Sequence, residues 1–261
     1  MHRKGTQGEL EVSYAGSGER VVLVHGSIVG ASLTWRHQLE LAEHFRLCIP
    51  NRPGFGASAP LERGDFEREA PLIAALLDGG AHLIGHSYGA VIALHAAALD
   101  PENVRSLVIS EPGCLRVAAG VAEVDSAIAN GELLYGAAAK LEPLDFLRAF
   151  RGGVGSTHET PAHLEGELLH GAQLAMRERP PWESDPPLAA LRAAPFPKLV
   201  ISGAHSPVFE AVCDAVAREL GAQRATISGR GHTIPATGAP YNDLVREFIM
   251  RAATAQPSFQ A

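Results

Sequence analysis

A serine between two glycines, in segment 85–89 (GHSYG), is the part of this sequence best suited to chemistry. It lies between an apolar segment that predicts a strand, 82–85, and a small-residue segment that predicts a helix, 90–99. On a sharp strand-to-helix turn, the glycines remove side chains that would collide across the bend, and the serine hydroxyl is exposed. The amide of Tyr88 begins the helix and points to where an oxyanion would form. This arrangement predicts that Ser87 is a nucleophile.

A serine hydroxyl is a weak nucleophile at neutral pH and needs a base that accepts its proton. The sequence has twelve histidines, and His232 stands apart from the others because glycines bracket it in segment 228–233 (SGRGHT). This loop follows a predicted strand, 224–228, and lies after the nucleophile in chain order, as the serine, acid, histidine sequence of such sites requires. We therefore predict that His232 is the base.

Four stretches carry a resemblance to the α/β-hydrolase superfamily: 24–27 (VHGS), 51–58 (NRPGFGAS), the serine turn and the loop around His232. The resemblance covers the chain apart from residues 113–187. It implies an oxyanion hole made by the backbone amides of Ser27 and Tyr88 and no cofactor or metal. Asn51 stands where the family usually has aspartate, so we expect that turn to be structural.

The third catalytic group, an acid, departs from the family pattern. Members most often carry an aspartate after the strand equivalent to 198–202, but this chain reads GAHS at 203–206. Glu111 directly follows another predicted strand, 104–110, next to the nucleophile strand, and could reach Nδ1 of His232. This placement is similar to that in zearalenone-type lactonases and some haloalkane dehalogenases. The dehalogenases use an aspartate nucleophile, so Ser87 argues against their chemistry.

Two rival acids follow the strand 198–202. Glu210 falls in a predicted helix, and Asp214 is expected to be solvated. His205 and Ser206 occupy the place of the missing aspartate and could hydrogen-bond near the site. We predict Glu111 as the acid that orients the base.

Apolar segments such as 21–24 and 46–50 alternate with helical ones through the first 110 residues, and the core resumes with the apolar segment 198–202. This pattern predicts an α/β fold with a mostly parallel central sheet flanked by helices. Residues 1–112 and 188–261 form the predicted α/β-hydrolase core. Residues 113–187 change to helical segments rich in alanine, leucine and charge, which predicts an inserted helical cap.

Composition limits the classes of partner. The 261 residues carry a net charge of −7 without a basic stripe, so neither nucleic acid nor an anionic membrane surface is favoured. The three cysteines have no disulfide or zinc spacing, which favours a cytoplasmic location, and the histidines of residues 113–187 have no regular metal spacing. The basic N-terminus leads into no apolar segment, so we expect no export or membrane signal.

These observations favour hydrolysis of a carboxylic ester or lactone of a small to medium, partly apolar substrate, through an acyl-enzyme on Ser87. The same scaffold also supports hydrolysis of carbon–carbon bonds and cofactor-free lyase or cyclisation steps. A third interpretation, a non-catalytic protein of hydrolase fold that binds a ligand, is kept open by the missing acid after strand 198–202.

Overall fold

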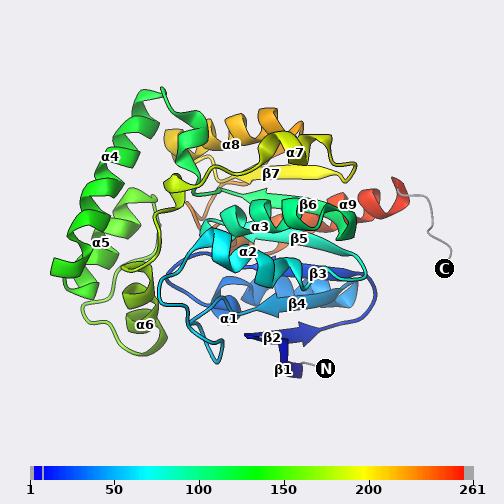
Figure 1. The fold of residues 1–261 in the computed structure, drawn as a ribbon, viewed down its shortest axis with the longest axis horizontal. Coiled ribbons are helices and arrows are strands. Elements are labelled where there is room, and N and C mark those ends of the chain that lie inside the picture. The colour runs from blue at the N-terminus through cyan, green and yellow to red at the C-terminus, as the bar shows by residue number, and fades with distance from the viewer. Residues whose placement is uncertain (1–2, 8, 256–261) are drawn as a thin grey trace.

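The computed structural model describes residues 3–7 and 9–255. Its centre is an eight-stranded sheet in the order β1-β2-β4-β3-β5-β6-β7-β8 (Figure 1). The pairs β1–β2 and β2–β4 are antiparallel, and every other pair is parallel. The strands are β1 (Arg3–Gln7), β2 (Leu10–Ala15), β3 (Arg20–Val24), β4 (Arg46–Pro50), β5 (Ala81–His86), β6 (Val104–Ser110), β7 (Lys198–Ser202) and β8 (Gln223–Thr226).

The sheet has an apolar layer on each face because its strands alternate between two separate cores. Residues such as Val22, Leu83 and Val200 pack with α2, α3 and α8 on one face. Their neighbours, such as Ile84 and Ile201, pack with η1 and α9 on the other. Strands buried on both faces are typical of parallel sheets covered by helices. The flanking helices are α1 (Ala31–Thr34), α2 (Phe66–Ala74), α3 (Tyr88–Leu99), α7 (Leu188–Ala193), α8 (Pro207–Leu220) and α9 (Ala239–Ala255), with the 3₁₀ helices η1 (Arg36–Glu43), η2 (Pro101–Asn103) and η6 (Ile234–Thr237).

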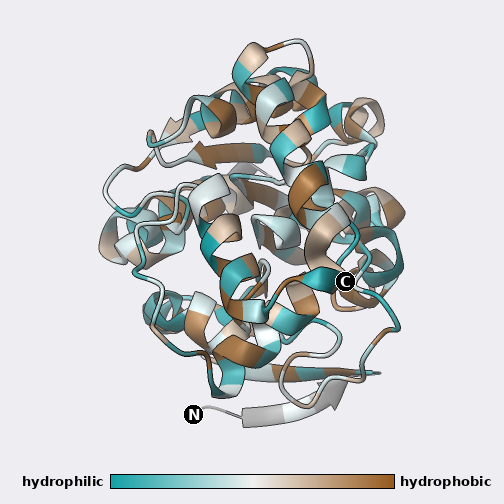
Figure 2. Ribbon diagram, turned by 90° about the vertical axis from the view of Figure 1, so that its left-hand side faces the viewer, coloured by the Kyte–Doolittle hydropathy of each residue, from teal (hydrophilic) through white to brown (hydrophobic). Residues whose placement is uncertain are grey.

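Three further helices lie side by side at one edge of the sheet, at the left of Figure 1. They come from the chain between β6 and β7 and share a small core that includes Phe146, Leu147 and Ala172. From this side, hydrophilic and hydrophobic residues are interspersed along the helices (Figure 2). The elements of this segment are α4 (Ala122–Ala137), α5 (Pro143–Gly153) and α6 (Gly166–Ala175), with η3 (Leu115–Ala118), η4 (Ala138–Lys140) and η5 (Pro181–Glu183).

The carboxyl ends of the parallel strands bring distant segments together. His86 at the end of β5 pairs with Ser110 at the end of β6, and Ser110 also pairs with Ile201 of β7. The residues that follow these three strands therefore meet at one edge of the sheet, where ligands bind in open α/β sheets.

The structure confirms the predicted fold class, and β4, β6 and β7 have the predicted bounds. The strands β1 and β2 were not predicted. The sequence of β1, RKGTQ, has no apolar residue, and its place in the sheet depends on antiparallel pairing with β2. No helix of the part of the chain described here is both long and apolar enough to cross a membrane.

Candidate active site

Ser87 lies on the turn between β5 and α3 with φ +56° and ψ −122°. This conformation is sparsely populated for a residue with a side chain, and such strain is found mostly at functional sites. Two glycines make the turn possible. A Cβ on Gly85 would lie 2.6 Å from Cα of Ala90, and one on Gly89 would lie 2.3 Å from the carbonyl oxygen of His25. The packing around the elbow therefore requires both glycines.

His232 lies beside this serine. Its Nε2 is 2.9 Å from Oγ of Ser87, and its Nδ1 is 2.7 Å from Oε2 of Glu111. His86 donates a hydrogen bond from Nε2 to the carbonyl oxygen of His232, and the ring of Phe209 stacks on the imidazole with 4.4 Å between centroids. The structure thus brings together the three residues that the sequence predicts as nucleophile, base and acid.

Glu111 is fully buried and has a strained backbone, with φ +41°. Its Oε1 accepts a hydrogen bond from the amide of Gly203 at 2.7 Å, and its Oε2 faces Nε2 of His205 at 2.9 Å as well as His232. Burial alone would raise the pKa of this carboxyl, but the hydrogen bonds and charges of His232 and His205 outweigh burial and lower it. Glu111 is therefore an ionised acceptor at neutral pH.

This charge assigns the imidazole protons. An ionised carboxylate only accepts hydrogen bonds, so Nδ1 of His232 and Nε2 of His205 both donate to Glu111. In neutral His232, Nε2 is then left to accept the proton of the Ser87 hydroxyl. This is the tautomer that a general base for Ser87 requires.

The rival acids have other partners. Glu210 accepts from the amide of Ala204 at 3.0 Å and pairs with Arg224 at 2.8 Å. Asp214 pairs with the same Arg224 at 2.9 Å. The expectation that His205 hydrogen-bonds near the site is confirmed by its contact with Glu111.

Ser27 and Tyr88, whose amides are the predicted oxyanion donors, both line the cavity that Ser87 lines. No residue in the described ranges accepts a hydrogen bond from either of these N–H groups. The carbonyl oxygen of Gly26, in the same peptide plane as the Ser27 N–H, accepts from Nη1 of Arg52 at 2.9 Å and Nδ1 of His25 at 2.8 Å. Because these two bonds fix the plane, they also fix the direction of the Ser27 N–H.

Comparison with known proteins shows the family of this chain. A model of the Alpha/beta hydrolase family matches residues 21–247. The chain belongs to this family. Among curated relatives, a pimeloyl-[acyl-carrier protein] methyl ester esterase from Chromobacterium violaceum is 37% identical over 100 residues, which cover 38% of this chain and 39% of the relative. Lipase LipV from Mycobacterium tuberculosis is 30% identical over 128 residues, covering 47% of this chain and 49% of that protein.

These matches span less than half the length of either relative. Among solved structures, a thermophilic esterase from Thermogutta terrifontis aligns with 97% of this chain and 99% of its own, with a TM-score of 0.60 and 24% identity. At that identity the likeness supports the shared fold.

Two further histidines of the α/β-hydrolase motifs hold loops in place. Burial, with the nearby charge of Arg52, lowers the pKa of His25 to about 3. Burial and the neighbouring His232 lower the pKa of His86 to about 4. Both rings are therefore neutral at pH 7. His25 donates from Nδ1 and accepts the Arg52 amide proton at Nε2, which ties the Ser27 loop to the turn at 51–58.

Arg52 lies at the centre of a buried charge network that the sequence motifs did not predict. Glu69 pairs with Nε and Nη2 of its guanidinium at 2.8 and 2.9 Å, and Glu178 accepts from Nη2 at 2.8 Å. The guanidinium also lies 4.2 Å from the ring centroid of Tyr88. Ser27 donates from Oγ to Glu178 at 2.5 Å. The Arg52 cation thus contacts the Tyr88 ring directly and is linked to Ser27 through Glu178.

A cavity of about 740 Å³ lies above Ser87. Helices α4 and α5, together with η5 and the start of α8, form its walls, and most of its lining is apolar. Its larger side chains are Leu115, Leu134, Tyr135, Phe150, Trp182, Val208 and Phe209. The only charged lining residue among those described is Glu123.

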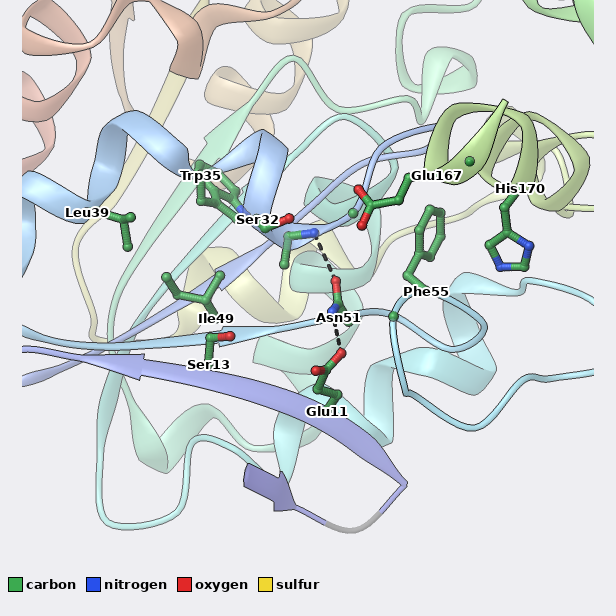
Figure 3. A pocket seen from close by; sticks show the side chains of 14 residues that line it. Glu11, Ser13, Ser32, Trp35, Leu39, Ile49, Asn51, Phe55, Glu167 and His170 are labelled. Atoms are coloured by element: carbon green, nitrogen blue, oxygen red, sulfur yellow. Dashed lines mark hydrogen bonds between the residues drawn. The ribbon is translucent and has the colours of Figure 1, made fainter. Parts of the chain in front are cut away.

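A second cavity, of about 450 Å³, lies between α1, the β2–β4 edge and α6 (Figure 3). Asn51 bridges its wall: Oδ1 accepts from the amide of Ala31 at 3.0 Å, and Nδ2 donates to Glu11 at 2.8 Å. This agrees with the expected structural role of Asn51. Ser87 does not line this cavity.

One cluster of described residues, Glu111, His205 and His232, offers three metal-ligating atoms within 4.8 Å of one another. The two imidazoles bind the Glu111 carboxylate directly through hydrogen bonds. The same atoms therefore already form the chain that orients His232. The three cysteines are buried free thiols.

Proposed function

We propose that this α/β-hydrolase cleaves carboxylic esters through an acyl-enzyme on Ser87. The observation that carries the proposal is the hydrogen-bonded chain from Ser87 through His232 to the buried Glu111, at the floor of an apolar cavity. Acyl transfer needs a nucleophile, a base and an orienting acid that are joined by hydrogen bonds. This chain also favours an enzyme over the non-catalytic alternative.

In the first half-reaction, Oγ of Ser87 attacks the ester carbonyl while Nε2 of His232 takes the hydroxyl proton. The ionised Glu111 stabilises the imidazolium that forms. The negative oxygen of the tetrahedral intermediate accepts hydrogen bonds from the amides of Ser27 and Tyr88, and one such donor contributes about 3 to 4 kcal/mol. His232 then protonates the departing alkoxide as the acyl-enzyme forms.

In the second half-reaction, a water molecule replaces the alcohol. His232 takes a proton from this water, and the resulting hydroxide attacks the acyl carbon. Collapse of the second tetrahedral intermediate breaks the bond to Oγ of Ser87, which recovers its proton from His232. The carboxylic acid leaves, and no cofactor or metal takes part.

The proposal also covers the kind of substrate and the location of the protein in the cell. Residues 113–187 act as a cap that encloses a small to medium, partly apolar ester or lactone, which is supported by the apolar lining from α4, α5 and η5. An esterase and a lipase among the partial relatives support ester cleavage. A small molecule is the only proposed partner. The cytoplasmic location stays a prediction.

The decisive experiment is release of p-nitrophenol from p-nitrophenyl butyrate by the wild-type protein and by Ser87→Ala, with folding monitored by circular dichroism. We expect turnover that disappears in Ser87→Ala without loss of folding. Ser32→Ala, which removes an exposed serine hydroxyl outside the catalytic chain, is the matched control and should retain full activity. A folded wild-type protein without turnover would contradict the proposed function.

A further inference from the structure

Helix α4 presents one of its faces to the cavity above Ser87. The α4 residues that line the cavity come in adjacent pairs that recur every four positions, as expected for one face of a helix. They are Ala122, Glu123, Ser126, Ala127, Asn130, Gly131, Leu134 and Tyr135. The face runs about 16 Å along the cavity from Glu123 to Leu134, at about 1.5 Å per residue.

This face changes character along its length. Its polar side chains, Glu123, Ser126 and Asn130, all precede Gly131, whereas its last residues are Leu134 and Tyr135. A Cβ on Gly131 would lie 2.5 Å from the ring of Trp182, so this glycine lets the indole pack directly against α4. The α4 wall of the cavity thus has an apolar end, where the Trp182 ring packs, and a more polar end at Glu123, here called the polar arm.

The charge of the polar arm is not compensated within the cavity. No lysine or arginine of the described chain lines it. Arg116 of the nearby η3 pairs with Glu132 at 2.9 Å, and neither of these residues lines the cavity. Glu123 is exposed at the start of α4 and forms no ion pair with any residue that the structure describes.

From this asymmetry we propose that Glu123 sets the charge preference of the site: the substrate group that lies along the first half of α4 is neutral or cationic, and a carboxylate there is disfavoured. The proposal rests on the ester-hydrolase function argued above. Two unit charges separated by roughly 8 Å near a protein surface interact by enough to change affinity several-fold. Neutralising Glu123 should therefore relax the preference, and a lysine in its place should reverse it.

Two substrate pairs test the proposal, because either the acyl or the alcohol group can lie in the polar arm. The acyl pair is p-nitrophenyl butyrate and the anionic mono-p-nitrophenyl glutarate. The alcohol pair is butyrylcholine and its neutral carbon analogue, 3,3-dimethylbutyl butyrate. The measured quantity is the ratio of kcat/KM for the charged and neutral members of each pair, at low ionic strength and again at 0.5 M salt.

In at least one pair, we expect Glu123→Gln to shift the kcat/KM ratio about threefold and Glu123→Lys to shift it about tenfold. The shift should favour the anionic substrate in the acyl pair or disfavour the cationic substrate in the alcohol pair. Both shifts should be smaller at 0.5 M salt. Glu132→Lys is the matched control, because it changes the net charge equally on the same helix outside the cavity lining. It should shift neither ratio by more than about twofold.

The outcomes separate this inference from the function on which it rests. If the wild-type protein hydrolyses none of the neutral esters, the proposed function fails. If it hydrolyses them but neither ratio responds to Glu123→Lys, or both lysine variants shift the ratio equally, the role of Glu123 is wrong while the hydrolase function stands.

Discussion

His205 donates a hydrogen bond from Nε2 to Oε2 of Glu111 over 2.9 Å, and the same oxygen accepts from Nδ1 of His232. His205 lies in the loop after β7, where most α/β-hydrolases carry their catalytic aspartate. The loop after β7 lacks a carboxylate, but it supplies the His205 imidazole and the Gly203 amide. Both donate hydrogen bonds to Glu111, the carboxylate that follows β6. His205 contacts the acid but not Ser87, so its expected role is to position Glu111.

Removing this contact should loosen Glu111 without removing it. For His205→Ala we expect kcat to fall about three- to tenfold with little change in KM, since one hydrogen bond to a charged group contributes about 1.5 kcal/mol. The acid limb of the pH–rate profile should also move, because the carboxylate that accepts from His232 then has one hydrogen-bond donor fewer. His205→Gln, which keeps an N–H donor, should restore much of the rate.

The control for this experiment is His163→Ala, which removes an exposed histidine of the segment between β6 and β7. It should leave both kcat and the pH profile unchanged. An acid limb that stays in place in His205→Ala would show that His205 only supports the loop.

The identity of the acid is tested by comparing two glutamates. Glu111→Gln keeps the size of the side chain but removes the charge that stabilises the imidazolium, so kcat for p-nitrophenyl butyrate should fall by about 10² to 10⁴. Glu210→Gln should change kcat less than about threefold, because this side chain pairs with Arg224 and the Ala204 amide. Near-normal activity in Glu111→Gln would rule out our assignment.

The contact between Ser27 and Glu178 tests how the oxyanion loop is held. Ser27→Ala keeps the backbone amide but removes the hydrogen bond from Oγ to the buried Glu178. We expect a three- to tenfold loss in kcat with a smaller change in KM, because a donor to the transition state is less well fixed. Steady-state kinetics beside the Ser32→Ala control will measure this, and an unchanged kcat would show that the amide needs no such support.

Substitution of two glycines by alanine should change the free energy of unfolding in opposite directions. A Cβ on Gly89 would meet the backbone of the His25 loop at 2.3 Å, whereas a Cβ on Gly136 of α4 would meet no atom within 4 Å. Gly89→Ala should lower the free energy of unfolding by about 1 to 3 kcal/mol or more, and Gly136→Ala should raise it by up to about 1 kcal/mol. Urea unfolding measures both, and equal stabilities would contradict the packing described at the elbow.

Stability should fall as the pH drops below 6.5. His25 and His86 are buried as neutral rings with pKa values of about 3 and about 4, whereas in the unfolded chain each binds a proton near 6.5. Below 6.5 the unfolded chain therefore binds more protons, which costs about 1.4 kcal/mol per pH unit for each histidine. The loss from each histidine continues until the pH reaches its native pKa.

Glu111 acts in the same direction at lower pH. Its pKa is lowered from 4.5, so its contribution is complete above 4.5 and is lost as the pH falls through its native pKa. Urea unfolding at pH 7.5, 6, 5 and 4.5 should show a steady decrease in the unfolding free energy. A free energy that stays constant from pH 7 to 5 would refute the burial of neutral histidines.

Much of the fold was predictable because its signals are local. The apolar strands β4, β6 and β7 and the turn around Ser87 depend on residues adjacent in the chain. The strand β1 was not predictable in this way, since its polar residues join the sheet only by pairing with β2. A polar edge strand has no apolar pattern of its own.

The sequence by itself determined the nucleophile turn, because two glycines and a serine between a strand and a helix leave little choice of local geometry. It also predicted Glu111 through its position directly after β6. Only the tertiary structure decided that His205 and the Gly203 amide hold this carboxylate, and that Arg52 and Glu178 hold the loop of Ser27, the proposed oxyanion donor. These contacts join segments about 25 to 150 residues apart, and their geometry exists only when the parallel strands place their carboxyl ends at one edge of the sheet.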